Sequence, residues 1–247
     1  MASTEDHNHS PLAQFEINSI IDLNIGNLNV SFTNSSVAMV TTVIFIVTFL
    51  TMTVKKRSII PSRMQVISES IYTFIAQLLQ DTVGEDGRKY FPFVFTIFMF
   101  VLIGNMVGMI PYSFTFTSHI IVTFALATVV FIGVTILGFI KHKMHFFSFF
   151  VIPGLPIYML PLLIPIEIIS YLSRPISLSV RLFANMLAGH TLLKVFAGFV
   201  VSLGIAGVFP LAFIVALTGL EILIAFLQAY VFAILTCLYI NDALHLH

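Results

Sequence analysis

The stretch from Phe91 to Ile140 contains no Lys, Arg, Asp or Glu. A water-soluble domain does not tolerate such a run, because ordinary soluble chains are about 25% charged. Over the whole chain of 247 residues, only 9% are charged and 58% are hydrophobic. Since so few ionisable groups cannot cover a surface that faces water, the sequence predicts an integral membrane protein.

Runs of about 20 apolar residues are long enough to cross the hydrocarbon core of a bilayer as helices. The sequence predicts three such spans, at 37–54, 91–114 and 119–140. Residues 66–83 place apolar side chains on one helical face and polar side chains on the other, so we expect an amphipathic helix on the membrane surface. Residues 1–36 form a polar N-terminal segment, and 37–247 form a single membrane domain.

The last hundred residues predict two longer helices, at 157–201 and 205–240, separated by Gly204, Gly207 and Pro210. A helix of this length is about 67 Å long at 1.5 Å per residue. Because that is more than twice the roughly 30 Å hydrocarbon core, it has to tilt strongly or bend. The predicted fold is an all-α membrane protein with about five transmembrane helices plus the surface helix, in which the last two are long, strongly tilted and form a hairpin.

Basic residues are distributed unevenly between the two sides of the membrane. They gather after the first and third predicted spans, whereas residues 1–36 contain no Lys or Arg. The positive-inside rule therefore predicts the N-terminus outside and the C-terminus inside. The formal net charge is zero, which gives no reason to expect a nucleic-acid partner.

Three charged residues within apolar sequence, Glu167, Arg174 and Arg181, follow one another at intervals of seven. Seven residues fall within about 20° of two helical turns, so the three share one face. The residues three, four, seven and eight positions after Arg181 extend this face and are small or polar: Ala184, Asn185, Ala188 and Gly189. Small residues let another helix approach closely, and a fixed cation there suits a carboxylate on that partner. The alternative is that Arg181 pairs with Glu167 or Glu221 only to stabilise the fold.

Glu221 and Gln228 on the last predicted helix are seven apart and nearly share a face. An ionisable group within the bilayer is costly unless it is paired or hydrated, which favours a functional role for Glu221. His190 lies about 180° around its helix from Arg181 and titrates near neutral pH. His190 and Glu221 on consecutive antiparallel helices could relay protons. Structural hydrogen bonding remains the alternative for Gln228, and for His119 and Asn105, which could instead line a polar cavity.

Residues 173–190 read SRPISLSVRLFANMLAGH, and this stretch closely resembles the signature of subunit a of F-type ATP synthases. Three further stretches support the resemblance: EILIAFLQAY at 221–230, GNMVGMIP at 104–111 and PLAQFE at 11–16. The resemblance covers essentially the whole chain, in the style of alphaproteobacterial and mitochondrial members.

The resemblance implies that Arg181 matches the essential arginine that faces the rotating c-ring. It implies that the polar residues lining the proton half-channels are Asn185, Gln228, Glu167, His190 and Glu221. Many bacterial members carry an acid at the position of His190 and a histidine at that of Glu221, which suggests that the two positions are coupled. Gly108 and Ser113 stand where some bacterial members have carboxylates in the outer half-channel. The candidates for that route here are His119, Asn105 and Glu221.

The function implied is that of a stator subunit that couples proton translocation to ring rotation and ATP synthesis, with ATP chemistry on other subunits. The expected partners are the c-ring, subunit b or an equivalent peripheral stalk, the F1 sector indirectly, protons and lipid, with no cofactor or metal. The expected location is an energy-transducing inner membrane, bacterial or alternatively mitochondrial. Two alternatives are a secondary transporter or channel with an arginine-based anion site, which would predict internal repeats, and a passive assembly anchor.

Overall fold

The computed structural model describes residues 16–22, 24–25, 28–29, 31–55, 61–110, 113–143 and 159–245. Several predicted features fall partly outside these ranges. They are the start of the polar N-terminal segment, the basic residues that directly follow Lys55, residues 111–112 of the span expected at 91–114, and the first residues of the helix expected at 157–201.

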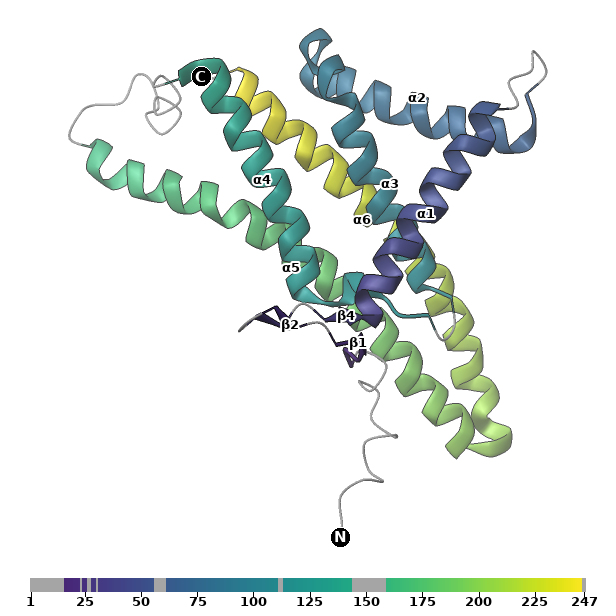
Figure 1. The fold of residues 1–247 in the computed structure, drawn as a ribbon. Helices are drawn as coiled ribbons and strands as arrows, with labels where there is room; N and C mark the ends of the chain where they lie inside the picture. Colours follow the sequence, from purple (N-terminus) through teal and green to yellow (C-terminus); the bar gives the residue numbers. More distant parts are fainter. Residues whose placement is uncertain are drawn as a thin grey trace. The chain divides into compact units, whose positions relative to one another are not determined.

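Six α-helices make up most of the described chain (Figure 1). They are α1 (Asn34–Lys55), α2 (Arg63–Val83), α3 (Phe91–Gly108), α4 (Ile120–His142), α5 (Leu160–Ser202) and α6 (Val208–Leu244). The described connections between them contain three short 3-10 segments: η3 (Glu85–Tyr90), η4 (Phe116–Ser118) and η7 (Gly204–Gly207). Within the described ranges, five helical segments are long and apolar enough to cross a membrane, and α2 is not among them. The prediction of an all-α membrane protein with two long C-terminal helices is therefore confirmed.

The observed helix ends differ from the expected ones at several places. Helix α3 ends at Gly108, well before Phe114, because the chain turns there and Thr115 packs against Gly108. Helix α5 continues without interruption through Pro165 and Pro175 and is about 65 Å long at 1.5 Å per residue. Helix α6 continues beyond residue 240 to Leu244.

Glycine makes the turn between α5 and α6 possible. Gly204 adopts φ +57°, in the left-handed region that favours glycine. At Gly207, an added Cβ would lie 2.5 Å from the carbonyl oxygen of Val200, so no larger residue fits without movement. The tight turn brings the two helices back beside each other.

The N-terminal segment contains short strands that the sequence did not predict. Strand β1 (Ser19–Ile21) pairs antiparallel with β4 (Phe32–Thr33), and β2 (Asn24–Ile25) pairs antiparallel with β3 (Leu28–Asn29). The side chain of Asn34, at the start of α1, donates to the carbonyl oxygen of Glu16 at 3.0 Å. This hydrogen bond ties the segment to the first span.

The chain forms two compact units, which are described separately. The first unit comprises Met1–Lys55, Met99–His119 and Leu182–Ala229, and the second comprises Lys56–Phe98, Ile120–Arg181 and Tyr230–His247. Helices α3, α5 and α6 contribute segments to both units.

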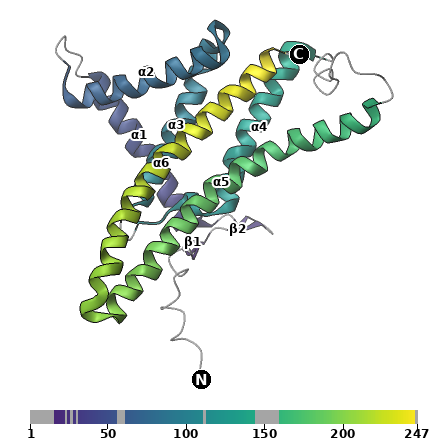
Figure 2. The same ribbon diagram turned by 180° about the vertical axis from the view of Figure 1, so that it is seen from behind.

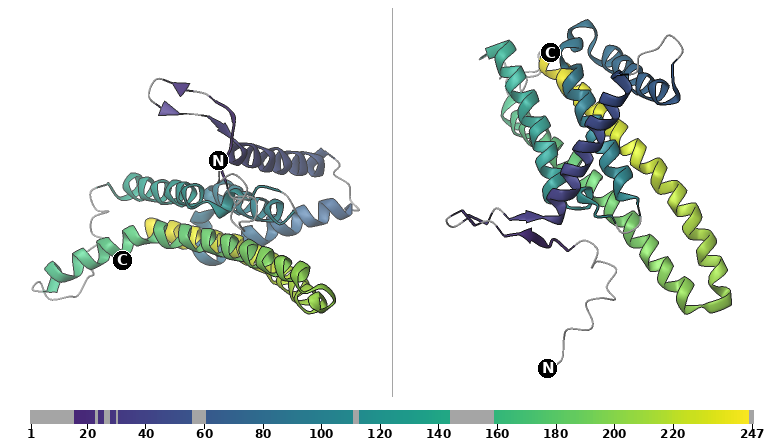
Figure 3. Two further views of the ribbon diagram at one scale, coloured as in Figure 1. Left: turned by 90° about the horizontal axis from the view of Figure 1, so that it is seen from below. Right: turned by 45° about the vertical axis from the view of Figure 1, so that its right-hand side comes forward.

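In the first unit, the end of α5 and the start of α6 run antiparallel and side by side (Figures 2 and 3). The rings of Phe196 and Phe213 lie 4.7 Å apart between centroids and join the two helices near the turn. Further along, Leu182 and Met186 on α5 and Ala225 and Ala229 on α6 are fully buried. The long hairpin is thus held by apolar packing at both ends of this segment.

In the second unit, α2 packs on α3 through aromatic pairs, including Tyr72 with Phe91 at 4.6 Å between ring centroids. Helix α2 is amphipathic, as its sequence indicates, and buries Ile75, Leu79 and Val83. Ile67, near the start of the helix, is 50% exposed, so α2 becomes buried only toward its end.

Candidate functional site

The first unit brings an acid and a histidine together between α5 and α6. Glu221, buried on α6, has its Oε1 atom 3.6 Å from Nδ1 of His190 on α5. Neither carboxylate oxygen of Glu221 has a hydrogen-bond partner among the described residues. A buried carboxyl with unmet hydrogen-bonding capacity is costly, so this group is set up to exchange a proton or to meet water.

The close approach of Glu221 to α5 depends on Gly189. A Cβ at this position would lie 2.6 Å from Oε1 of Glu221. The sequence analysis placed Gly189 with Ala184 and Ala188 on the face that receives a partner helix. That prediction stays untested for Gly189, and the structure adds a second role, because its small size makes room for Glu221 within the chain.

Thr115 determines the hydrogen-bonding state of His190. Its hydroxyl donates to the carbonyl oxygen of Gly108 at 3.1 Å, and the same Oγ1 atom lies 3.2 Å from Nε2 of His190. Because Thr115 donates its hydroxyl proton to the carbonyl oxygen of Gly108, its oxygen accepts a hydrogen bond from Nε2–H of His190. In neutral His190 this leaves Nδ1, the atom nearer to Glu221, as the unprotonated nitrogen that can take up a proton. The sequence analysis missed Thr115, because its contact with His190 spans 75 positions.

Asn185 and Gln228, two polar residues noted in the sequence, form a hydrogen-bonded pair between α5 and α6, next to the pair of His190 and Glu221 along the chain. The Nδ2 atom of Asn185 on α5 donates to Oε1 of Gln228 on α6 at 3.0 Å. Gln228 is buried, and its Nε2 atom has no hydrogen-bond partner within the described part of the chain. The amide nitrogen therefore keeps donors available for water or for another group.

Asn105 lies on α3 and joins it to α6. It is fully buried, and its Nδ2 atom donates to the carbonyl oxygen of Ala225 at 3.3 Å. Its Oδ1 atom has no partner among the residues that the structure describes. Asn105 thus supports the backbone one helical turn from Glu221 and leaves one acceptor unused.

A polar cavity of about 770 Å³ reaches His190 within the first unit. Its polar lining comes from the N-terminal segment, the connection after α3, and the hairpin. These lining residues are Glu16, Asn18, Asn34, Ser113, Thr115, His190, Lys194 and Thr218. A cavity of this size with several polar partners is large enough to hold many waters. It therefore offers an aqueous route to the histidine, and the sequence analysis did not anticipate the contributions of Glu16 and Lys194.

None of the three residues expected in the outer route, His119, Asn105 and Glu221, is among the described residues that line this cavity; Glu221 is reached from it only through His190. His119 packs on Phe114 with ring centroids 5.1 Å apart, and burial lowers the pKa of its imidazole. Neither His119 nor Asn105 is among the residues that line the cavity in the described part of the chain. Gly108 and Ser113, which replace carboxylates of some bacterial members, do line the cavity. The hydroxyl proton of Ser113 is donated to the carbonyl oxygen of Val107 and not into the cavity.

Arg181 lies on α5, in the second unit, and its side chain is exposed. Among the described residues, no carboxylate oxygen lies within 4.0 Å of its guanidinium, although Glu167 is on the same helix. The pairing with Glu167, in the same unit, that would have given Arg181 a purely structural role is therefore not observed. Ala184 and Ala188, three and seven residues later, are exposed as well.

Arg174 lies seven residues before Arg181 on the same helix but, unlike Arg181, is paired with an acid. Its Nη1 atom lies 3.0 Å from Oδ2 of Asp242 on α6, and its guanidinium is over the rings of Tyr171 and Tyr239. No pattern in the sequence indicates this pairing, because Asp242 lies 68 positions away near the end of the chain. Of the two arginines, only Arg174 has its charge neutralised within the described chain.

The described residues contain no group of three or more His, Cys, Asp or Glu side chains that could hold a metal ion. The first unit instead brings together one buried acid, one histidine and amides with unused capacity, which can bind water and accept or release protons. Arg181, in the second unit, is an exposed cation that can attract an external carboxylate.

A family model described as "ATP synthase A chain" matches residues 35–241. Proteins named ATP synthase subunit a are similar over nearly the whole length. The one from Pelagibacter ubique is 59% identical over 240 residues, covering 96% of this chain and 98% of that protein. The one from a Chelativorans species is 58% identical over 242 residues, covering 95% and 97%. The chain therefore belongs to the ATP synthase A chain family.

Proposed function

We propose that this chain is the proton-conducting stator subunit of an F-type ATP synthase. In this proposal it supplies two half-channels beside the c-ring and couples proton flow to ring rotation. The observation that carries the proposal is Arg181, an exposed cation on a membrane-spanning helix with no carboxylate within 4.0 Å among the described residues. Because an unpaired charge within a bilayer is expensive, we assign its counter-ion to another molecule, the c-ring.

Arg181 acts as a barrier rather than as a proton carrier in this mechanism. A guanidinium stays protonated under essentially all conditions, so protons cannot pass through it. A deprotonated c-ring carboxylate about 4 Å away gains roughly 4 kcal/mol at an effective dielectric of 20, which attracts the carboxylate without trapping it. Exposed Ala184 and Ala188 leave room on the same face for the c-ring helix.

The outer half-channel in this proposal begins at the polar cavity and leads through His190 to Glu221. Thr115 keeps Nε2 of His190 as a donor, so Nδ1 exchanges the proton with the Glu221 carboxyl. Asn105, Asn185 and Gln228 supply the polar groups beyond Glu221, and Glu167 lies on the α5 segment that we assign to the inner half-channel. We leave His119 out of the route because its imidazole stacks on the ring of Phe114, with the ring centroids 5.1 Å apart, and does not line the cavity within the described chain. It takes no part in the contacts that His190 makes with Thr115 and Glu221.

The driving force in this mechanism is the membrane potential, which supplies about 2.3 kcal/mol per elementary charge per 100 mV. ATP chemistry takes place on the F1 sector, and subunit b or an equivalent peripheral stalk holds this chain against rotation. We place the chain in an energy-transducing inner membrane, bacterial by preference, with the N-terminus outside and the C-terminus inside. The basic residues after α1 and at the end of α4 support this orientation.

The alternative functions fit the observations less well. A transporter with an anion site at Arg181 would predict two repeats with matched broken helices, whereas α5 and α6 are each continuous. A passive anchor would have no need of a buried Glu221 whose carboxylate lacks hydrogen-bond partners among the described residues.

The test is ATP-driven proton pumping in inverted membrane vesicles that contain the complete complex with Arg181→Ala. We expect pumping to be lost and a passive proton leak to appear, with normal assembly. Arg174→Ala is the matched control, because it removes a guanidinium from the same series and should keep most of the pumping. Unchanged pumping in Arg181→Ala would sink the proposal, and loss of pumping through failed assembly would favour the anchor.

A further inference from the structure

The wall of the polar cavity in the first unit carries two charged side chains within the described chain. Glu16 lies on the N-terminal segment, and Lys194 lies on α5. Neither forms an ion pair within 4.0 Å with another described residue. Since neither charge is neutralised by a close partner, both act on any ion that enters the cavity.

Two hydrogen bonds to Asn34 hold the backbone around Glu16 in place. The Nδ2 atom of Asn34 donates to the carbonyl oxygen of Glu16 at 3.0 Å, and its backbone N–H donates to the carbonyl oxygen of Asn18 at 3.1 Å. Asn34 is the first residue of α1, and it lines the cavity together with Asn18. The extended segment is thus fixed on a membrane-spanning helix, which keeps the exposed side chain of Glu16 at the cavity.

Lys194 opposes the movement of protons toward His190. It lies four residues after His190, so the two side chains are neighbours on one face of α5, and both line the cavity. An ammonium group there makes the cavity less favourable for a further positive charge. A carboxylate on the same wall offsets this charge and can accept a proton at an oxygen. Within the described chain, Glu16 is the one carboxylate that lines the cavity.

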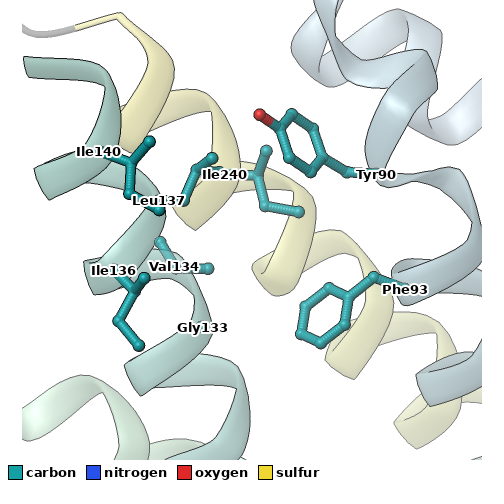
Figure 4. A pocket seen from close by; sticks show the side chains of 8 residues that line it. All are labelled: Tyr90, Phe93, Gly133, Val134, Ile136, Leu137, Ile140 and Ile240. Atoms are coloured by element: carbon teal, nitrogen blue, oxygen red, sulfur yellow. The ribbon is translucent and has the colours of Figure 1, made fainter.

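An apolar crevice in the second unit lacks such charges (Figure 4). It lies between α3, α4 and α6, has a volume of about 240 Å³, and has no charged side chain in its described lining. The hydroxyl of Tyr90 is the one polar side-chain group there. The side chains of this crevice therefore offer a proton no counter-charge, whereas those of the cavity in the first unit do.

We propose that Glu16 collects protons from the outside and delivers them into the cavity toward His190. This role rests on the proposed function, because it requires the cavity to be the entrance of the outer half-channel. In each cycle the Glu16 carboxylate binds one proton at an oxygen and releases it to water in the cavity, which returns the carboxylate to its charged form. Collection matters most when protons are scarce, so the contribution of Glu16 should grow as the pH rises.

The test is ATP synthesis by the complete complex in proteoliposomes, with ADP and phosphate added only outside. Only complexes whose F1 sector faces outward then contribute, and their outer half-channel opens to the vesicle interior. A potassium diffusion potential drives synthesis at equal pH on both sides, and each variant is compared with the unmodified complex at the same pH. We expect Glu16→Gln to lower synthesis several-fold at pH 8.5 and to leave it near normal at pH 6.5, with unchanged subunit content.

Three further variants separate the carboxylate of Glu16 from other properties of the segment. Glu16→Asp keeps the carboxylate and should keep most of the synthesis at both pH values. Asn18→Asp, added to Glu16→Gln, places a carboxylate on the same cavity wall and should recover much of the loss at pH 8.5. Asp22→Asn is the matched control, because it removes a carboxylate that lies on the same segment but does not line the cavity, and synthesis should stay normal.

Normal synthesis by Glu16→Gln at pH 8.5 would overturn the proposal. A loss of equal size at both pH values, or one that Asn18→Asp does not relieve, would also overturn it, because the side chain would then act on the fold of the segment and not on protons. Arg181→Ala in the same assay tests the proposed function separately. If Arg181→Ala abolishes synthesis while Glu16→Gln has no effect, the proposed function stands and only the role of Glu16 fails.

Discussion

The two units differ in the kind of buried polar group that lacks a hydrogen-bond partner among the described residues. In the first unit these groups include the carboxylate of Glu221 and the amides of Gln228 and Asn105, and His190, which lies against Glu221, lines a cavity. In the second unit they include the hydroxyls of Thr128 and Ser179, whereas the charged Arg174 is paired with Asp242. Since an unsatisfied buried carboxylate costs more stability than an unsatisfied hydroxyl, the retention of Glu221 in the first unit points to a use other than folding.

The largest effect is expected at the pair of Glu221 and His190, where the contrast between the units is sharpest. Glu221→Gln keeps the shape but removes the exchangeable proton, so proton flux through the complete complex should fall roughly 100-fold or more. The measurement is the rate of ATP-driven acidification in inverted vesicles, with assembly checked by subunit content.

Exchanging the residues at 190 and 221 is the control for Glu221→Gln, because it keeps both chemical groups. The double variant His190→Glu with Glu221→His retains one acid and one histidine in contact, and we expect it to recover flux relative to either single variant. If Glu221→Gln pumps at the normal rate, the acid is not part of the route.

A smaller effect is expected at Thr115, which acts on proton flow only through His190. Thr115→Val removes the acceptor for Nε2–H, so neutral His190 no longer has a fixed tautomer, and flux should fall several-fold with a changed pH profile. Thr115→Ser keeps the hydroxyl and should restore both. An unchanged pH profile in Thr115→Val would show that the threonine only packs against Gly108.

In the second unit, disruption of a paired group should cost stability rather than transport. Asp242→Asn weakens the bond to Arg174, which is partly exposed, so we expect a loss of about 1 kcal/mol or less in the free energy of unfolding. Thermal unfolding of the detergent-solubilised chain measures this loss. A loss of pumping comparable to that of Glu221→Gln, in a stable complex, would contradict the division between the two units.

The smallest effect is a pH dependence at His119. Burial lowers the pKa of His119 from its usual 6.5, so the unfolded chain binds more protons than the folded chain as the pH falls below that value. Stability should therefore be full above pH 6.5 and decline below it, and His119→Phe should remove part of this decline. The comparison is thermal unfolding at pH 8 and pH 5.5, and we expect pumping by His119→Phe to stay normal.

The sequence predicts some features of this molecule but not others, for physical reasons. Runs without charge predict spans directly, because the bilayer imposes a length and a composition on each helix. Partners that lie on different helices leave no such pattern, and the contacts of Thr115 with His190 and of Arg174 with Asp242 were therefore missed. The end of α3 was placed too late because apolar residues continue beyond Gly108 into the turn. The exposed, unpaired state of Arg181 within the described chain likewise required the structure, since spacing alone left a pairing with Glu167 or Glu221 open.

The contact between Gly189 and Glu221 has a consequence for how this chain can change during evolution. A side chain at 189 and a glutamate at 221 compete for the same space, so substitution at either position alters what the other accepts. A lineage that gained alanine at 189 would first have to shorten or move the acid, and one that moved the acid would free position 189 to vary. Substitutions at the two positions should therefore be correlated among related sequences, although the positions are far apart in the sequence.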